Sequence, residues 1–296
     1  MIPINIDTIG KNIKFYRSLK GLTQCELAEG ICTQAQISNI EAGKFIPLST
    51  TLFAISKRLE VDMNQFFHAF ENPQYDYVQE FIQEVRRQTE NRNYKEVFQL
   101  VTAEEKNKLF KSSSLQQFIL WHKGVAIAYL YKDYTLAIKM LFKAINLTYN
   151  GKRNYTQEEI QILNSIAAIY DLKGHSTQAT EYYERALKHA NFIQDFNPKI
   201  KVRILYNYAK AETTLANYSK AINLAEQGRQ ICIENGLLYL FEECTYQKGF
   251  CYLLQGEVEM GKRLIEQAVV LFRLEKKEEL ATFAIKEVEE ALTTMK

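Results

Sequence analysis

Apolar residues recur every three or four positions along almost the whole chain, which is the spacing of an amphipathic α-helix. Ile9, Ile13 and Tyr16 follow this spacing near the start, and it continues to the last residues. Stretches that alternate apolar and polar residues are rare, and only four prolines and twelve glycines occur in 296 residues. The pattern therefore predicts an all-α protein.

Two helix starts lie close together in residues 22–43. Thr23 is followed three residues later by Glu26, and Thr33 is followed by Gln36, so each pair is typical of a capping box. Gly30, between them, suits the tight turn of a helix-turn-helix. With the flanking patterns, the sequence predicts helices over 6–20, 24–29 and 34–42, a fourth introduced by Pro47 and Ser49, and a fifth that follows an Asp62–Gln65 capping box and ends near Phe70.

The predicted third helix has an apolar and a polar face. Ile37 and Ile40 should face the core, which directs the polar residues between them outward. Amide side chains bind adenine through two hydrogen bonds, a methyl group contacts thymine, and an amide at a helix start suits a phosphate. We therefore expect DNA contacts from Gln24, Thr33, Gln34, Ala35, Ser38 and Asn39. The alternative for each residue alone is an ordinary solvated helix face.

This segment resembles the lambda-repressor-like, Xre-type helix-turn-helix family over about the first 70 residues. The matching residues are Arg17, Gly21-Leu22-Thr23-Gln24, Leu27-Ala28, Gln34, Ile37-Ser38 and Ile40-Glu41-Ala42-Gly43. In that family the residues that match Arg17 and Glu41 form a partly buried ion pair. The resemblance therefore implies a structural role for this pair, and not a catalytic one.

The remaining sequence contains an internal repeat of 40 or 42 residues. Its reference positions are Tyr94, Tyr134, Ser176, Tyr218 and Val258. Small residues recur at fixed distances from these positions, as expected where two antiparallel helices approach closely. The repeat predicts helical hairpins at roughly 75–103, 114–147, 156–190, 199–234 and 238–274, and a terminal helix at 276–294.

A repeat of this kind resembles the tetratricopeptide repeat, whose hairpins stack into a right-handed superhelix. Asn72-Pro73 marks the boundary before it. We expect a helix-turn-helix domain at 1–72, a linker helix at the start of the first repeat at 73–92, repeats at 93–275 and a capping helix at 276–296.

The first helix of each hairpin should line the concave face of such an array. Amides on that face suit the main chain of an extended peptide, and basic side chains suit a carboxylate. Counting from the small residues gives the predicted peptide-binding set of Lys123, Gln161, Asn164, Arg203, Tyr206, Asn207, Lys210, Tyr246 and Gln247. For any single member, a solvated helix face is the alternative.

An Xre-type domain followed by five repeats resembles the RNPP family of peptide-responsive regulators of Gram-positive bacteria. The stretches that carry this resemblance are GLTQCELAEGICTQAQISNIEAG, ILNSIAAIY and LYNYAKAE. It implies a cytoplasmic, quorum-sensing transcription factor, and no enzyme, that binds a secreted and re-imported peptide. It also implies that Asn164 and Asn207 lie in the peptide groove.

We further expect a homodimer on a palindromic operator in double-stranded DNA, because a single helix-turn-helix makes few contacts. Peptide binding would then alter the array or the linker helix and change the spacing of the two recognition helices.

Composition adds several exclusions. Residues 1–70 hold seven basic and six acidic residues, so the motif, and not the charge, carries the DNA assignment. No apolar run reaches about 18 residues and no signal peptide is recognisable, so no membrane partner is expected. The five cysteines lack a C-x-x-C pattern and the four histidines form no ligand cluster, so we expect no metal, cofactor or catalytic site.

Three alternatives stay open at this point. In the first alternative, the protein is a constitutive DNA-binding repressor whose repeats bind a protein partner. In the second, it is a redox-responsive regulator that acts through Cys25 or Cys32. A third alternative is an enzyme regulator similar to the peptide-controlled phosphatases of sporulation, but those proteins lack an Xre-type reader.

Overall fold

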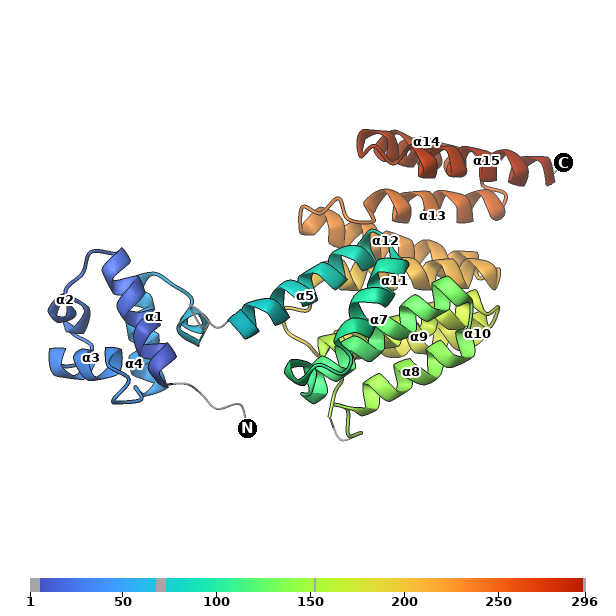
Figure 1. Cartoon of the computed structure of the whole chain (residues 1–296). Helices are drawn as coiled ribbons and strands as arrows, with labels where there is room; N and C mark the ends of the chain where they lie inside the picture. The colour runs from blue at the N-terminus through green and yellow to red at the C-terminus, as the bar shows by residue number, and fades with distance from the viewer. Residues whose placement is uncertain (1–5, 68–72, 152, 295–296) are drawn as a thin grey trace. The chain divides into compact units, whose positions relative to one another are not determined.

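The computed structural model describes residues 6–67, 73–151 and 153–294, and every regular element in these ranges is helical. The all-α prediction is therefore confirmed. Contacts along the chain divide it into two compact units, Met1–Gln83 and Glu84–Lys296. Figure 1 shows the helices of each unit, which are described separately below.

The helices of residues 6–67 in the N-terminal unit share a small core. Its helices are α1 (Ile6–Leu19), α2 (Gln24–Ala28), α3 (Gln34–Glu41), α4 (Ser49–Leu59) and the 3₁₀ helix η1 (Met63–Phe67). Ile13, Leu27, Ile37 and Ile55 come from four different helices, and all four are fully buried in this core. Burial of these side chains is the main stabilising contribution to the unit.

The local signals around α2 and α3 act as predicted. Thr23 and Thr33 each accept a hydrogen bond from the third residue of the helix they cap, and Glu26 and Gln36 complete two capping boxes. Gly30 adopts φ +69°, the left-handed conformation that a tight turn between the helices requires. The helix-turn-helix is therefore fixed by local sequence as well as by the core.

The predicted fifth helix is wrong in type. Residues 63–67 form a 3₁₀ helix, and Asp62 caps it by accepting from the Asn64 backbone N–H at 2.7 Å. Asn12 of α1 donates to the carbonyl oxygen of Phe66 at 3.0 Å and so holds this segment against α1. The predicted end near Phe70 lies outside the described residues.

The second unit contains paired antiparallel helices. Its helices are α5 (Pro73–Glu90, which begins in the first unit), α6 (Tyr94–Glu104), η2 (Lys108–Phe110), α7 (Ser113–Tyr131), α8 (Tyr134–Asn146), α9 (Gln157–Leu172), α10 (Ser176–Ala190), α11 (Pro198–Thr214), α12 (Tyr218–Glu234), α13 (Phe241–Leu254), α14 (Val258–Leu274) and α15 (Glu278–Thr294). Each reference position of the sequence repeat is the first residue of the second helix of a hairpin. The repeat in sequence is thus a repeat in structure.

Small residues allow the two helices of a hairpin to approach closely. Ala137, Ala179 and Ala221 are fully buried at equivalent positions of α8, α10 and α12. The fifth hairpin has one glycine inside each helix, Gly249 in α13 and Gly261 in α14. A Cβ on Gly261 would lie 2.9 Å from the carbonyl oxygen of Gly249. A side chain there would force α13 and α14 apart.

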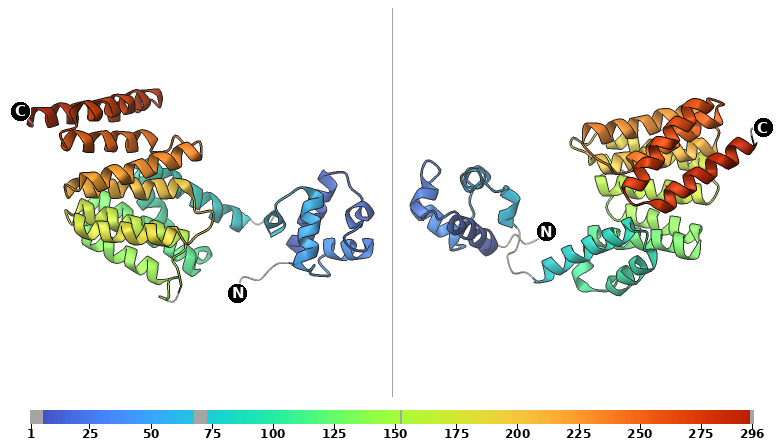
Figure 2. Two further views of the ribbon diagram at one scale, coloured as in Figure 1. Left: turned by 180° about the vertical axis from the view of Figure 1, so that it is seen from behind. Right: turned by 90° about the horizontal axis from the view of Figure 1, so that it is seen from above.

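The first helices of successive hairpins also contact one another, from α7 through α9 and α11 to α13 and then α15. The views in Figure 2 show α13, α14 and α15 stacked at the end of the array that α11 and α12 precede. Helix α15 therefore occupies the place of a further first helix, and the row of first helices forms one continuous face. None of the helices in the described ranges is both long and apolar enough to span a bilayer.

Candidate functional site

Helix α3 presents an exposed polar row at its N-terminal end. Gln34, Ala35 and Asn39 are exposed and Ser38 is half-buried, whereas Ile37 is fully buried. Thr33, the cap of the helix, is exposed as well. The predicted DNA-binding side chains thus share one solvent-facing surface, and their contact with DNA stays a prediction.

A chain of hydrogen bonds connects this surface to the interior of the N-terminal unit. Gln34 donates from Nε2 to Oε1 of Gln24 at 2.8 Å, and Gln24 donates from Nε2 to Oε2 of Glu41 at 2.9 Å. Arg17 binds both carboxylate oxygens of Glu41, with Nε–Oε1 at 2.6 Å and Nη2–Oε2 at 3.0 Å. The hydrogen bond to Glu41 raises the pKa of Arg17. The ion pair is therefore part of the support for the exposed amides.

These bonds leave defined hydrogen-bonding capacity on the two glutamines. Gln34 retains its side-chain oxygen and one amide hydrogen, which are the acceptor and donor that adenine requires in the major groove. Gln24 retains one amide hydrogen, which suits a phosphate oxygen. Both orientations are fixed before any ligand is bound.

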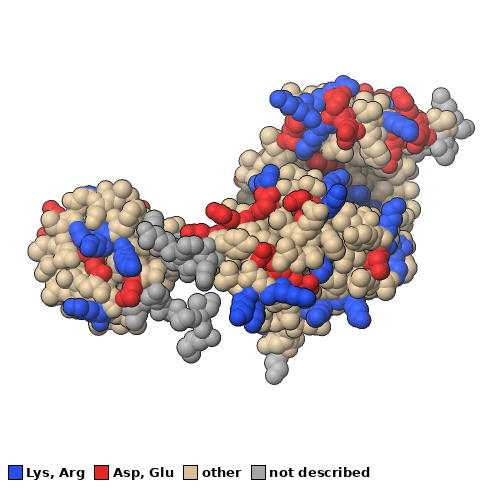
Figure 3. Space-filling model, viewed as in Figure 1, with Lys and Arg blue, Asp and Glu red and all other residues tan. Residues whose placement is uncertain are grey.

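Charge contributes little to this surface. Figure 3 shows basic and acidic side chains scattered over the visible face of the N-terminal unit without a field of one sign. The six predicted DNA-binding residues are themselves uncharged, so the surface offers a ligand hydrogen bonds and not a general attraction to phosphate.

The row of first helices carries a ladder of polar contacts. Arg203 of α11 donates from Nη2 to Oε1 of Gln161 of α9 at 2.8 Å. One helical turn further, Asn207 donates from Nδ2 to Oδ1 of Asn164 at 3.2 Å. Asn164 is only 6% exposed. The structure thus brings together four of the predicted peptide-binding residues from two neighbouring repeats.

The remaining predicted residues divide into two groups. Tyr206 is half-buried and lies under the ammonium of Lys210, which is 5.8 Å from the ring centroid. Burial raises the pKa of Tyr206, so its hydroxyl stays protonated at neutral pH. Tyr246 lies in the next first helix and donates its hydroxyl to Glu287 of α15. These three side chains extend the ladder along the array.

Lys123 and Gln247 are engaged elsewhere. The ammonium of Lys123 forms an ion pair with Glu105 at 2.7 Å, between the first and second hairpins. Gln247 is 5% exposed and donates to Oγ1 of Thr213 at 2.7 Å. Both residues form contacts between hairpins, as Gln161 and Asn164 also do, and Tyr246 contacts α15. A role in peptide binding stays a prediction for all nine residues.

Counting from the small residues also places His122 on the inner face, but it does not single out Glu287. His122 is buried against Phe118 and Trp121, and its Nδ1 lies 2.9 Å from the carbonyl oxygen of Phe118. Burial lowers the pKa of His122 to about 3, so the neutral ring donates from Nδ1 and presents Nε2 as an acceptor. Glu287 lies on α15, which continues the row formed by the first helices of the hairpins. Including α15 in the count would have placed Glu287 on the inner face of that row.

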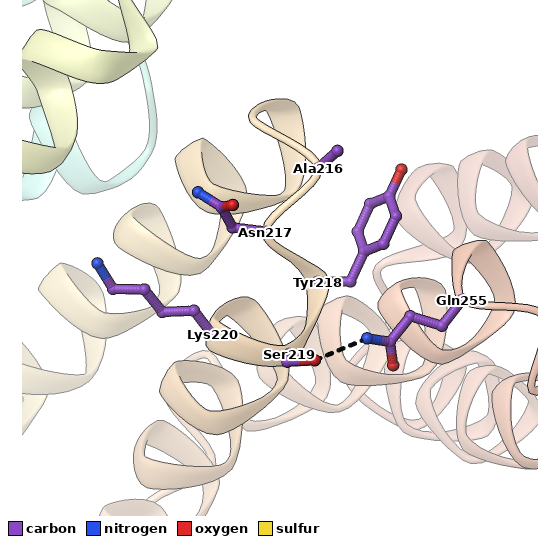
Figure 4. A pocket seen from close by; sticks show the side chains of 6 residues that line it. All are labelled: Ala216, Asn217, Tyr218, Ser219, Lys220 and Gln255. Atoms are coloured by element: carbon purple, nitrogen blue, oxygen red, sulfur yellow. Dashed lines mark hydrogen bonds between the residues drawn. The ribbon is translucent and has the colours of Figure 1, made fainter.

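A surface depression lies away from this ladder, at the turn between α11 and α12 and the end of α13. Figure 4 shows its lining residues, Ala216, Asn217, Tyr218, Ser219, Lys220 and Gln255. Gln255 donates from Nε2 to Oγ of Ser219 at 2.9 Å, and Lys220 forms an ion pair with Glu212 at 2.8 Å. The first contact connects the fourth and fifth hairpins and the second lies within the fourth hairpin. None of the predicted binding residues lines the depression.

Burial favours a structural role for three of the five cysteines. Cys232, Cys244 and Cys251 are buried, and Cys25 is exposed. Cys32 is half-buried, and burial raises the pKa of its thiol, which disfavours the reactive thiolate. In the described ranges no group of histidine, cysteine and acidic side chains has the geometry of a metal site.

Comparison with known protein families identifies both units. The model of the RNPP family C-terminal domain matches residues 82–292, and a helix-turn-helix model matches residues 13–66. The chain belongs to the RNPP family. A helix-turn-helix domain followed by an RNPP C-terminal domain is the organisation of a transcription regulator of this family.

Solved structures give the same result. The structure of Bacillus thuringiensis PlcR with the peptide PapR7 and DNA is similar over 94% of this chain and 99% of PlcR, with a TM-score of 0.82 and 27% identity. PlcR in its apo form gives a TM-score of 0.67 at 24% identity, over 95% and 98% of the two chains. Streptococcus thermophilus ComR, with DNA and its signalling peptide ComS, gives 0.64 at 16% identity, over 96% and 99%. No curated protein matches the chain.

Proposed function

We propose that this RNPP protein regulates transcription by binding operator DNA through α3 and a short signalling peptide through its row of first helices. The observation that carries the proposal is the pair of polar contacts between α9 and α11, Arg203–Gln161 and Asn207–Asn164. The same chain presents an exposed, pre-oriented polar row on α3. PlcR, which is similar over nearly its full length, has been solved with both a peptide and DNA.

The DNA-binding step follows from the free capacity of the two glutamines. Gln34 is oriented by Gln24, so the entropy of fixing its side chain has already been lost before binding. Asn39, one turn along α3, offers a second amide to a base edge. The small side chains of Ala35 and Ser38 allow α3 to come close to the base edges of the major groove.

The peptide-binding step uses the asparagine pair. Asn207 donates to Asn164, which leaves the carbonyl oxygen of Asn207 and the amide hydrogens of Asn164 for other partners. An extended peptide offers a C=O and an N–H at each residue, and these match the two unused groups. Tyr206 adds a protonated hydroxyl on the same helix as Asn207.

We extend the proposal to a homodimer that acts in the cytoplasm. A two-fold dimer presents two copies of α3 to half-sites about one DNA turn apart, roughly 34 Å, so the operator is a palindrome. The signalling peptide then has to enter the cell to reach the array.

The DNA part is tested by selecting genomic fragments with the purified full-length protein. We expect a palindromic consensus, and we expect Gln34→Ala and Asn39→Ala each to weaken binding to it by about tenfold or more. Gln36→Glu is the matched control: Gln36 is on the same helix but its side chain completes the cap of Thr33, and glutamate also suits that position. Failure to enrich any sequence would refute this part.

The peptide part is tested by passing the peptide fraction of spent culture medium over the immobilised protein. The wild-type protein should retain a short peptide that the double variant Asn164→Ala/Asn207→Ala loses. Gln227→Ala is the control, because Gln227 is an exposed amide on α12 whose side chain donates to Asn223 of the same helix. Equal retention by all three proteins would exclude the asparagine pair as the site.

A further inference from the structure

Basic residues are concentrated in one part of the second unit. Residues 106–153 contain nine lysine and arginine residues and a single acidic residue, Asp133, whereas the whole chain contains 37 basic and 35 acidic residues. This segment comprises the loop before α7, the second hairpin formed by α7 and α8, and the loop that follows α8. One hairpin therefore carries a large excess of positive charge in a chain whose other residues are more acidic than basic.

Five of these lysines form what we call the basic edge of the array. All five are exposed, and they come from the loop before α7 and from α8: Lys106, Lys108, Lys111, Lys139 and Lys143. The two lysines of α8 are four residues apart and so lie on the same side of that helix. In Figure 3, basic side chains gather along the lower margin of the array, where Figure 1 places α8 and the segment before α7.

Hydrogen bonds hold the loop and the last turns of α8 at the same end of the hairpin. Gln116, in the first turn of α7, donates from Nε2 to the carbonyl oxygen of Phe110 at 2.8 Å and so holds the loop against α7. Gln117 donates to the carbonyl oxygen of Ala144 at 3.1 Å, next to Lys143 in α8. The start of α7 thus contacts both segments that carry the lysines.

Little acidic charge faces this edge. Asp133 lies at the opposite end of the hairpin, where it caps α8. Glu104 and Glu105 precede the loop, but Glu104 accepts a hydrogen bond from Asn107 at 2.6 Å and Glu105 is paired with Lys123. Within the described ranges, none of the five edge lysines forms an ion pair with a carboxylate. Their positive charge is therefore open to an external anion.

The edge suits the backbone of duplex DNA better than it suits a membrane or a single strand. Binding at a membrane interface needs apolar side chains beside the basic ones, and single strands need exposed aromatic rings. In residues 106–128 and 137–150, no large apolar side chain is exposed. Lysine binds phosphate oxygens as a point charge on a flexible stem, and duplex DNA carries one phosphate charge about every 1.7 Å along its axis.

The reader itself provides little of the charge that DNA binding requires. Residues 1–70 hold seven basic and six acidic residues, and the six predicted DNA-binding residues are uncharged. Sequence-independent affinity for DNA comes mainly from cationic side chains that replace the counterions of the phosphates. A second surface that carries such side chains would therefore complement α3.

We propose that the basic edge binds the phosphate backbone of duplex DNA outside the base pairs that α3 reads. The inference rests on the proposed DNA-binding function and adds a second DNA surface to it. The edge lies on the loop before α7 and on α8, the second helix of its hairpin, so it is distinct from the row of first helices proposed to bind the peptide. The edge supplies affinity, and α3 supplies sequence selectivity.

The salt dependence of DNA binding tests this proposal. Anisotropy titrations of the full-length protein use the operator duplex from genomic selection and a scrambled duplex of the same length, between about 50 and 200 mM KCl. In Lys106→Gln/Lys108→Gln/Lys111→Gln, the slope of log K against log salt should be shallower by about 2–3 for each bound protomer on both duplexes. The preference for the operator over the scrambled duplex should persist. Lys139→Gln/Lys143→Gln should make the slope shallower by about 1–2.

The matched control removes three exposed cations from other parts of the array, Lys173→Gln/Arg263→Gln/Lys286→Gln. It lowers the net charge of the chain as much as the loop variant does, and it should leave the slope unchanged. A slope that is reduced equally in the two triple variants would overturn the proposal, because the effect would then belong to the net charge and not to the edge.

A second measurement uses the unaltered protein. Lysines are acetylated in the presence and absence of the scrambled duplex, and each site is quantified by mass spectrometry. DNA should reduce acetylation of the five edge lysines by about threefold or more and leave Lys173 and Lys286 unchanged. In a parallel arm, vesicles of phosphatidylglycerol replace the DNA. Protection by the vesicles and not by DNA would overturn the proposal and assign the edge to a membrane surface.

Failure of the basic edge and failure of the reader give different results. Unchanged salt slopes in both lysine variants, with operator binding intact and no protection by DNA, would refute the edge and leave binding through α3 in place. A genomic selection that enriches no sequence, while the scrambled duplex still protects the edge lysines, would refute recognition by α3 and keep the edge.

Discussion

At the scale of single residues, Glu41 connects stability to recognition. Its carboxylate binds Arg17 through two hydrogen bonds and also accepts the amide of Gln24, which orients Gln34. One buried side chain thus holds α1, α2 and α3 together. The sequence indicated the Arg17–Glu41 pair through family resemblance, but no pattern in the sequence predicts the hydrogen bonds that connect the two glutamines.

Replacing Glu41 with glutamine should destabilise the N-terminal unit by about 3 kcal/mol, because Arg17 would remain buried without its counter-charge. Hydrogen exchange measured by mass spectrometry should show faster exchange over residues 24–41. Glu60→Gln, which removes only the exposed ion pair with Lys20, should change the stability by less than about 0.5 kcal/mol. Similar exchange in the two variants would contradict the structural role of Glu41.

At the scale of elements, the sequence predicted the hairpins and their small-residue positions well. Helical spacing and the recurrence of alanine and glycine are local signals, and they survive in the structure with each second helix beginning at a reference position. The fifth element of the first unit was harder to predict, because the Asp62 cap suits either helix type and the bond from Asn12 that fixes it comes from a distant segment.

The partners of inner-face side chains were likewise beyond sequence reasoning. Counting places Lys123 and Gln247 on the first helices of their hairpins. It does not predict that Lys123 forms an ion pair with Glu105 or that Gln247 donates a hydrogen bond to Thr213. Such pairs join residues from different hairpins, so their distances depend on how the hairpins stack.

Close packing of the fifth hairpin gives a prediction about glycine. Gly261→Ala should destabilise the array by about 1–3 kcal/mol, because the new Cβ would lie 2.8 Å from the backbone nitrogen of Leu253. Gly124→Ala is the control: its Cβ has no contact below 3.3 Å, and the better helix propensity of alanine offsets the crowding. Urea unfolding followed by circular dichroism measures both. Equal stability of the two variants would show that α13 and α14 can separate freely.

A cluster of charges at the end of the array predicts a dependence on pH. Lys277 in the turn before α15 binds Glu242, Glu243 and Glu275. Burial, with a hydrogen bond to Glu275, raises the pKa of Glu242 to about 7. Between the pKa of an unfolded glutamate, about 4.3, and pH 7, the folded state holds a proton that the unfolded state has released. The contribution of Glu242 to stability therefore falls as the pH rises through this range.

Glu242→Gln should remove this dependence. Relative to the wild type, the variant should gain at least ~1 kcal/mol of unfolding free energy as the pH is raised from 5 to 8. Glu278→Gln, which alters only an exposed pair with Arg273, should show no such trend. A constant difference for Glu242→Gln across this range would rule out the buried proton.

At the scale of the whole molecule, the chain joins a reader and a sensor that are separately recognisable. The helix-turn-helix family match ends at residue 66 and the RNPP match begins at residue 82. Helix α5 spans the boundary between the two compact units. It is therefore the covalent connection between the proposed peptide surface and α3, and in the proposed homodimer a change in α5 would reach two half-sites.

Operator affinity with and without peptide tests this account most directly. A labelled palindromic duplex, obtained by genomic selection, is titrated with the full-length protein while fluorescence anisotropy is followed, in the presence or absence of the peptide retained from spent medium. We predict that saturating peptide changes the affinity by fivefold or more, and that Asn164→Ala/Asn207→Ala abolishes the change without altering peptide-free binding. Superimposable curves with and without peptide, under conditions in which the peptide is bound, would contradict the central claim that the array controls the reader.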